Sequence, residues 1–415
     1  MSINGWTLTT EDVEHIALGA GVLGTGGGGN PYLGKLMVQG AIRDGAVIEI
    51  LPPQTVGDDD LLIAVSGMGA PTVSIEKLSR GNEATMAFRA LEEHLGEPAR
   101  AVVCGEIGGG NSMVPLEVAA RVNLPVVDAD PMGRAFPELQ MDTFNIGGVS
   151  TAPAALADEK GNVLVIARTQ DPLWTERLGR VVTVAMGGSA GLAMPALRGR
   201  QLKEAGIWGS YTLARRIGLA VRRAQRDKIR PEEALASLGA RLLFRGKIMD
   251  IKRVTTGGFA RGEAIIQGFQ DDAGSTMRVA IQNENLVAWR DEQVLITVPD
   301  LICILDDESG EPIGTEVLRY GLRVCVLAFA ADPKLSTPAG LAVVGPRAFG
   351  YDLPYRPFAA SGRASDGGWR GGMGSAERGA DGPPAAGRSG PCKKAGRGTN
   401  HGTIGSGEGH RSVPA

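Results

Sequence analysis

The chain has 415 residues, with 43 lysines and arginines against 46 aspartates and glutamates. Its length exceeds the roughly 100–200 residues of an average domain, so we expect two domains with a large buried core. The near balance of charge gives no basic surface for nucleic acid or for an anionic membrane, and we exclude both as partners.

The sequence shows none of the signals for membrane insertion or secretion. No segment reaches the roughly 18 consecutive apolar residues that a membrane-spanning helix needs, and the first residues lack the pattern of a signal peptide. The cysteines form no Cys-x-x-Cys pair, and only His15 and His94 precede the last 60 residues, which argues against a cysteine or histidine metal site. We therefore expect a cytoplasmic protein with reduced thiols.

Two helices are predicted at the start of the chain, joined by a run of four glycines. A Thr9-x-x-Asp12 capping pattern precedes apolar residues at helical spacing, which indicates an amphipathic first helix. Asn30 and Pro31 suit the N-cap and first position of a second helix, whose apolar residues fall between 33 and 41.

Short apolar runs then alternate with helical patterns: VIEIL, LLIAVSG, AVVCG and LPVVDAD are separated by stretches such as NEATMAFRALEEHLG. Runs this apolar are typical of parallel strands covered on both faces, so we predict a three-layer α/β domain with a mostly parallel sheet over residues 1–165. A turn at 159–162 is expected to close a hairpin near its end.

The second half changes character. A long helical pattern covers 203–228, and from about residue 243 six β segments follow at intervals of about ten residues, which predicts a helical linker and a β-rich domain over 166–356. Residues 357–415 are rich in Gly, Arg, Ala, Ser and Pro and cannot form a core, so we expect a disordered tail. Its abrupt composition favours a shifted reading frame over an ordinary tail.

The glycine run is the first candidate for chemistry. Four glycines let the backbone approach a ligand, and a helix N-terminus that follows them offers N–H groups to an anion or carbonyl oxygen. The run follows a helix and lacks the lysine of a Walker loop, so neither a Walker nor a Rossmann motif fits. The predicted substrate-binding residues are Thr25, Gly26, Gly27, Gly28, Gly29 and Asn30.

A second glycine loop, CGEIGGGNS, lies where a strand should end, and the next strand delivers acidic residues to the same sheet edge. Glu106, Asp128 and Asp130 would form a carboxylate cluster there, in which at least one pKa is raised toward neutrality, as general acid–base catalysis requires. We predict these three as catalytic. The predicted substrate-binding residues from this region are Gly108, Gly109, Gly110, Asn111 and Arg134.

Simpler roles remain open for the same residues. Glu106 and Asp130 suit helix capping, Arg134 suits an ion pair with one of them, and Asn30 and Asn111 suit N-caps. No cofactor is predicted, although a carboxylate cluster would also suit Mg²⁺ or another divalent cation. Cys104 has no base nearby in the sequence and is expected to be a buried strand residue.

The motifs LGTGGGGNPYLG, CGEIGGGNSMVPLEVAA and LPVVDADPMGRAFPELQM, in this order, resemble the S-methyl-thiohydantoin desulfurase family, whose members often accompany hydantoinase/oxoprolinase subunits. The resemblance covers about residues 7–358. It implies an α/β N-terminal domain, a swivelling β-rich C-terminal domain, and hydrolytic replacement of an S-methyl group on a five-membered ring to leave a hydantoin. It transfers no catalytic residue.

We therefore expect an enzyme in which Asp128 or Asp130 activates water, a glycine loop holds a ring oxygen, and a second, protonated carboxyl assists the thiol leaving group. The alternatives are an ATP-dependent hydantoinase/oxoprolinase-type ring-opening subunit and a non-catalytic accessory or small-molecule-binding subunit. The expected partners are a small-molecule substrate, a hydantoinase/oxoprolinase subunit, and further copies of the chain in a homo-oligomer.

Overall fold

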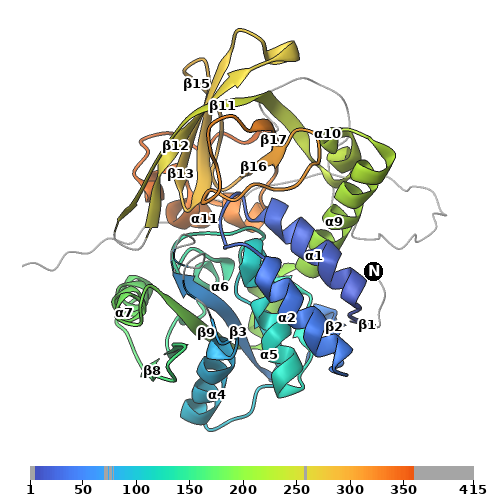
Figure 1. The fold of residues 1–415 in the computed structure, drawn as a ribbon. Coiled ribbons are helices and arrows are strands. Elements are labelled where there is room, and N and C mark those ends of the chain that lie inside the picture. Colours follow the sequence, from blue (N-terminus) through green and yellow to red (C-terminus); the bar gives the residue numbers. More distant parts are fainter. Residues whose placement is uncertain (1–4, 70–72, 74–76, 78, 257–258, 359–415) are drawn as a thin grey trace, which may run out of the picture. The chain divides into compact units, whose positions relative to one another are not determined.

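The computed structural model describes residues 5–69, 73, 77, 79–256 and 259–358 (Figure 1). All of them belong to one compact unit, Met1–Asp366. Apart from residues 357 and 358, the tail expected over 357–415 lies outside the described residues.

The first half forms an eight-stranded sheet in the order β1-β2-β5-β4-β3-β9-β7-β8. The strands are β1 Trp6–Thr7, β2 Glu49–Leu51, β3 Leu61–Gly69, β4 Ala101–Cys104, β5 Val126–Val127, β7 Ala154–Ala157, β8 Val163–Ile166 and β9 Ser189–Arg198.

This sheet is mixed, so the prediction of a mostly parallel sheet is wrong. Only the pairs β2–β5, β5–β4 and β4–β3 are parallel. Strand β9 pairs antiparallel with β3 and with β7, and β7 forms the expected hairpin with β8. A strand buried on both faces has the same apolar run in either direction, which is why the sequence did not reveal the antiparallel half.

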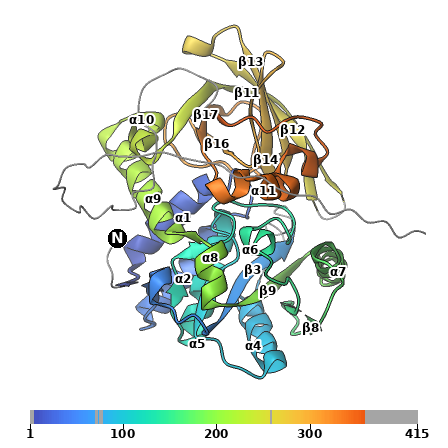
Figure 2. The ribbon, with the colours of Figure 1, turned by 180° about the vertical axis from the view of Figure 1, so that it is seen from behind.

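Helices cover both faces of the sheet (Figures 1 and 2). Ile63 and Val102 face one core with Phe88 of α4, while Leu62 and Val103 face another core on the opposite side. The helices of this half are α1 Thr10–Leu23, α2 Tyr32–Arg43, α4 Glu83–Leu95, α5 Val114–Val122, α6 Thr143–Ile146, α7 Pro172–Ala185 and α8 Gly199–Ala205.

Helix α1 has the predicted capping box, with Thr9 and Asp12 bonded reciprocally. It packs against α9 (Ser210–Asp227) with the two backbones close together. Glycines at the contact allow this approach, since a Cβ at Gly19 would overlap the carbonyl of Ala214 and a Cβ at Gly218 would overlap that of His15. This pairing holds the C-terminal end of α1, and therefore the first glycine loop, in place.

Two predicted helices differ from the structure. The helix expected over 203–228 is interrupted at Gly206 and Gly209, where the short strand β10 (Ile207–Trp208) pairs with β6 (Ala129–Asp130). In α2 the expected apolar face is largely exposed, with Leu33 at 56% and Leu36 at 42%. The periodicity was present, but it does not identify which face meets the core.

The second half forms a seven-stranded antiparallel sheet in the order β15-β14-β13-β12-β11-β17-β16, which confirms a β-rich domain. Its strands are β11 Arg241–Thr256, β12 Phe259–Gly268, β13 Thr276–Gln282, β14 Glu284–Arg290, β15 Gln293–Thr297, β16 Leu301–Asp306 and β17 Arg323–Phe329. Helix α10 (Pro231–Leu235) precedes this sheet and α11 (Pro338–Val344) follows it. In the part of the chain that the structure describes, no helix has the length and apolar character to cross a membrane.

Candidate functional site

The two glycine loops meet backbone to backbone. The N–H of Gly110 donates to the carbonyl of Gly29 at 2.7 Å, and that of Asn111 to the carbonyl of Gly28 at 3.1 Å. A Cβ at Gly28 would overlap the carbonyl of Gly108, and Gly109 adopts a φ of +62°. Much of the glycine content therefore serves the close approach of the two loops to each other.

A cavity of about 120 Å³ lies beside this junction and is lined by both halves of the chain. The lining residues are Gly28, Gly29, Ser66, Gly67, Met68, Gly69, Gly105, Glu106, Asn111, Met132, Phe136, Pro137, Glu138, Leu139, Arg180, Ser189, Asn283 and Glu284. We call it the carboxyl pocket, because the two buried side chains Glu106 and Glu284 both line it.

Glu106 follows strand β4 and is 6% exposed. The amide of Asn111 donates to its Oε1, and the N–H of Phe136 donates to its Oε2 at 3.2 Å. Burial raises the pKa of Glu106 to about 7, and these two hydrogen bonds only partly offset the rise. Near neutral pH this carboxyl therefore exists in both protonation states.

Glu284 begins strand β14 and is 2% exposed. Its carboxyl lies against Gly27, where any Cβ would overlap it, while its Oε2 has no hydrogen-bond partner among the described residues. Burial, together with the charge of Glu106, raises the pKa of Glu284 well above its ordinary value, and the charge of Arg134 only partly offsets this. These surroundings therefore favour the protonated form of Glu284.

Sequence reasoning missed Glu284. It stands at the head of an apolar strand in a distant part of the chain, and strand patterning does not reveal which loop a strand end approaches. The one available signal was a carboxylate between two asparagines, Asn283 and Asn285, at the start of an otherwise apolar run.

Asp128 and Asp130 are held by structural contacts and do not line the carboxyl pocket. Asp128 accepts from the N–H groups of Tyr211 and Thr212, which begin α9, at 2.8 and 3.2 Å. Asp130 accepts from the N–H of Ile107 at 3.0 Å and, in addition, from Met132, Gly133 and Ser210. Burial raises the pKa of Asp130 to about 6, but its oxygens are occupied by the loops that it positions.

Arg134 and Thr25 also serve the architecture. Arg134 is fully buried, and all five of its N–H donors are used: on the carbonyls of Ala135, Pro299, Asp300 and Asn285 and on the Thr25 hydroxyl. A guanidinium has five donors, so none remains for a substrate. The ion pair between Arg134 and one of the three predicted carboxylates, which the sequence left open as a simpler role, is not seen among the described residues.

The remaining predicted residues divide between the carboxyl pocket and its surroundings. Asn111 orients Glu106 and also accepts from the N–H of Gly67 at 2.7 Å. Asn30 accepts from the N–H of Tyr32, the first residue of α2, at 2.9 Å, but the N-cap of α2 is Pro31, so the prediction of Asn30 as N-cap is wrong. Gly26, Gly27 and Asn30 border a different cavity.

Cys104 is buried, and burial raises the pKa of its thiol, in keeping with a strand residue and not with a nucleophile. No group of three or more His, Cys, Asp or Glu side chains in the described residues is arranged to hold a metal ion.

Fold and site together define a two-domain protein, an α/β domain followed by a β-rich domain, with a buried carboxyl pair where the two meet. Residues 11–168 match the family described as S-Me-THD-like, N-terminal domain, and residues 170–358 match S-Me-THD-like, C-terminal domain. The chain belongs to this S-Me-THD-like family.

One similar solved structure is the crystal structure of a protein from Chromobacterium violaceum. It is 26% identical, and the alignment covers 85% of this chain and 100% of that chain with a TM-score of 0.72. No curated protein matches this sequence.

Proposed function

We propose that this chain is an enzyme that hydrolyses the methylthio group from an S-methyl-thiohydantoin or a related ring, releasing methanethiol and leaving a hydantoin. The observation that carries the proposal is the carboxyl pocket, in which Glu106 and Glu284 line one cavity with pKa values raised to different extents. The reaction requires the enzyme to remove one proton and to donate another, and two carboxyls in different protonation states can do this.

The reaction requires a base and an acid. Glu106, as carboxylate, removes a proton from a water molecule that attacks the ring carbon bearing the methylthio group, and passes this proton to the adjacent ring nitrogen. As the carbonyl forms, Glu106 takes the remaining hydroxyl proton, the C–S bond breaks, and Glu284, as carboxylic acid, protonates the departing sulfur. Transfer of the proton from Glu106 to Glu284 then restores both groups. One water is consumed: its oxygen stays on the ring carbon, and its two protons end on the ring nitrogen and on methanethiol.

The rest of the pocket suits a small ring with one apolar substituent. Met68, Met132 and Leu139 supply apolar lining for a methylthio group, while the Ser66 hydroxyl and the backbone at Gly29 offer donors for a ring carbonyl. In this proposal Asp128 and Asp130 are positioning residues, because they hold the loops that carry Glu106 and α9.

The test is methanethiol release from an S-methyl-thiohydantoin by the purified full chain and by Glu106→Gln and Glu284→Gln. Each change keeps the side-chain volume but removes the proton-transfer group, and we expect kcat to fall about 100-fold or more. The matched control is Glu117→Gln, because burial also raises the pKa of Glu117, to about 8, although it does not line the pocket.

Parallel assays with ATP and with Mg²⁺ separate the competing functions. Release that needs neither supports the proposal. Ring opening that depends on ATP, or the absence of turnover in wild type under every condition, would overturn it in favour of the ring-opening subunit or the accessory subunit.

A further inference from the structure

Helix α7 carries most of its large apolar residues toward solvent and its small and polar residues toward the protein. The buried residues of this helix are Thr175, Glu176, Gly179 and Thr183. On the opposite side Val181 is 69% exposed, and four other large apolar residues of the helix are exposed as well. Helices on the surface of a soluble protein normally have the reverse arrangement, with the apolar side toward the core.

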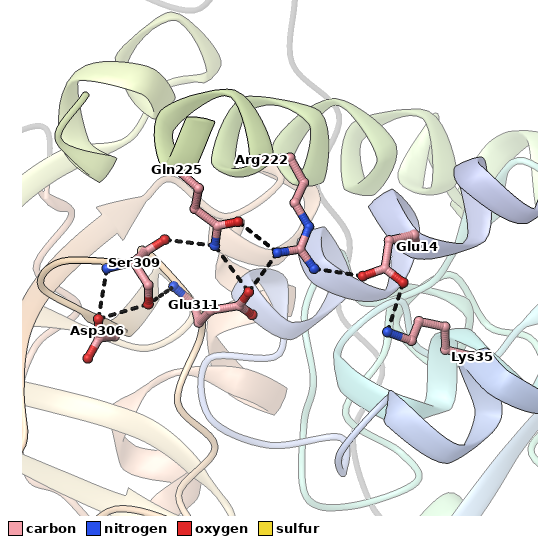
Figure 3. Close-up of polar contacts among 7 residues, drawn as sticks. All are labelled: Glu14, Lys35, Arg222, Gln225, Asp306, Ser309 and Glu311. Atoms are coloured by element: carbon pink, nitrogen blue, oxygen red, sulfur yellow. Dashed lines mark hydrogen bonds and ion pairs between the residues drawn. The ribbon is translucent and has the colours of Figure 1, made fainter. Parts of the chain in front are cut away.

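Helix α9 shows the ordinary arrangement within the same molecule. Ile217 and Val221 are among its buried residues. At its surface Arg222 pairs with Glu14 at 2.6 Å and with Glu311 at 2.9 Å, in a network of charged groups (Figure 3). The exposed side of α7 has no network of this kind, so its apolar residues are a feature to be explained.

Strand β8 extends the apolar surface of α7. It is the last strand of the eight-stranded sheet, and its only partner strand among the described residues is β7. Leu164 of β8 lies opposite Leu156, which belongs to the core that Val182 of α7 packs against, so Leu164 is on the side of the sheet that α7 covers. Both elements lie at the margin of the α/β domain (Figures 1 and 2). We call the exposed apolar residues of these two elements the α7 face: they are Leu164, Leu173, Trp174, Leu178, Val181 and Val184.

The α7 face is large enough for a protein interface. Its side chains expose roughly 550 Å² of apolar surface, near the upper limit for a patch on a soluble monomer. Two such faces would bury roughly 1,100 Å², and a biological interface is expected to exceed about 1,000 Å². The tail of the chain is poorly suited to cover the face, because residues 359–415 contain only four large apolar residues: Trp369, Met373, Ile404 and Val413.

We propose that the α7 face binds the α7 face of a second copy of this chain, with the two helices antiparallel about a two-fold axis between Leu178 and Val181. The face is broad near the start of α7, where Trp174 lies, and narrow near its end, where Val184 lies. Antiparallel pairing places the broad end of each helix against the narrow end of the other, as a self-complementary two-fold interface requires. The one exposed charged side chain of α7, Arg177, lies over its own Trp174 ring, 5.2 Å from the centroid.

The test is sedimentation equilibrium of the full chain from micromolar to near-millimolar concentration, where we expect a dimer. Val181→Glu would bring two unpaired carboxylates together at the axis, so its dissociation constant should rise about 100-fold or more. The matched control is Val47→Glu, because Val47 is another exposed valine, at 61%, and precedes β2 near the opposite edge of the sheet. This variant should dimerise as wild type does.

A second variant separates loss of the interface from loss of the fold. Leu178→Lys should also be monomeric alone. An equimolar mixture of Leu178→Lys and Val181→Glu should form dimers again, because the antiparallel arrangement places position 181 of one copy against position 178 of the other, where opposite charges attract. Misfolded variants would not rescue each other in this way.

The proposal is overturned by a wild type that is monomeric at every concentration, by a dimer that Val181→Glu leaves intact, or by a mixture of the two variants that stays monomeric. A monomeric wild type that binds neutral phosphatidylcholine vesicles, with binding lost in Val181→Glu, would assign the α7 face to a lipid surface instead. Because methanethiol is not measured, none of these results bears on the proposed reaction.

Discussion

Glu106 and Glu284 are the same residue type in one pocket, yet different surroundings raise their pKa values. Asn111 and the N–H of Phe136 stabilise the charged form of Glu106. Glu284 accepts from its own N–H and from that of Gly28, but its burial and the charge of Glu106 favour its neutral form. In the proposed reaction, the roles of base and acid thus follow from how burial and the neighbouring charge raise the pKa of each carboxyl.

This difference predicts the pH dependence of the reaction. Glu106 must be ionised to act as a base, so kcat/KM should fall about tenfold per pH unit below its pKa of about 7. Glu284 must be protonated to act as an acid, so the rate should fall again above its raised pKa. Initial rates between pH 4 and pH 9 measure the acid limb. An acid limb near pH 4.5, the ordinary value for a glutamate, would contradict the assignment of Glu106.

The sequence placed only one member of the acid–base pair. Glu106 was found because a glycine-rich loop after a buried strand is where α/β domains expose reactive groups. Asp128 and Asp130 looked equivalent by that argument, but α9 and the neighbouring loops begin at these carboxylates and occupy them. Glu284 requires the docking of one domain on another, which no local pattern contains.

At the scale of elements, the glycine loops owe their composition to backbone packing more than to contact with a ligand. Gly27 is the instructive position, because its φ is outside the left-handed region and its backbone accepts any residue. The three atoms nearest to a Cβ there all belong to the Glu284 side chain.

Gly27→Ala should therefore displace Glu284 and reduce kcat nearly as far as Glu284→Gln does, with the fold retained. Methanethiol release and the urea midpoint of unfolding, measured together, separate the two effects. The control is Gly40→Ala in α2, where a Cβ meets nothing within 4 Å. That change should keep full activity and raise stability by up to about 1 kcal/mol. Full activity in Gly27→Ala would show that the position of Glu284 is unimportant.

At this scale the sequence predicted whether a segment is a helix or a strand, but it did not predict the direction of a strand or the elements that it pairs with. The capping box of α1, the 159–162 hairpin and the strands of the second domain follow local rules, and the structure confirms them. The antiparallel insertion of β9 beside β3 and the break before α9 depend on packing between distant segments.

At the scale of the molecule, Arg134 joins the two domains. It comes from the α/β domain, and three of its five hydrogen bonds reach the β-rich domain, at Asn285, Pro299 and Asp300. Thr25 ties the first glycine loop to the same guanidinium. One buried side chain thus connects the loop, the strand that carries Glu284, and the segment before β16.

Arg134→Lys keeps the charge but loses at least two donors and the planar geometry, so buried carbonyls lose their partners. We expect the free energy of unfolding to fall by about 2–4 kcal/mol, measured by urea denaturation. Arg200→Lys, at an exposed pair with Asp59, should change it by less than about 0.5 kcal/mol. Equal effects of the two substitutions would contradict a joining role for Arg134.

Because Glu106 belongs to one domain and Glu284 to the other, turnover by this molecule would also report on its assembly. A chain with both domains folded but undocked would have a base without its acid. It would release no methanethiol, although its circular dichroism spectrum would match that of the native protein. The rate at which activity returns after dilution from denaturant would then measure the last step of folding, in which Glu284 comes into contact with Gly27.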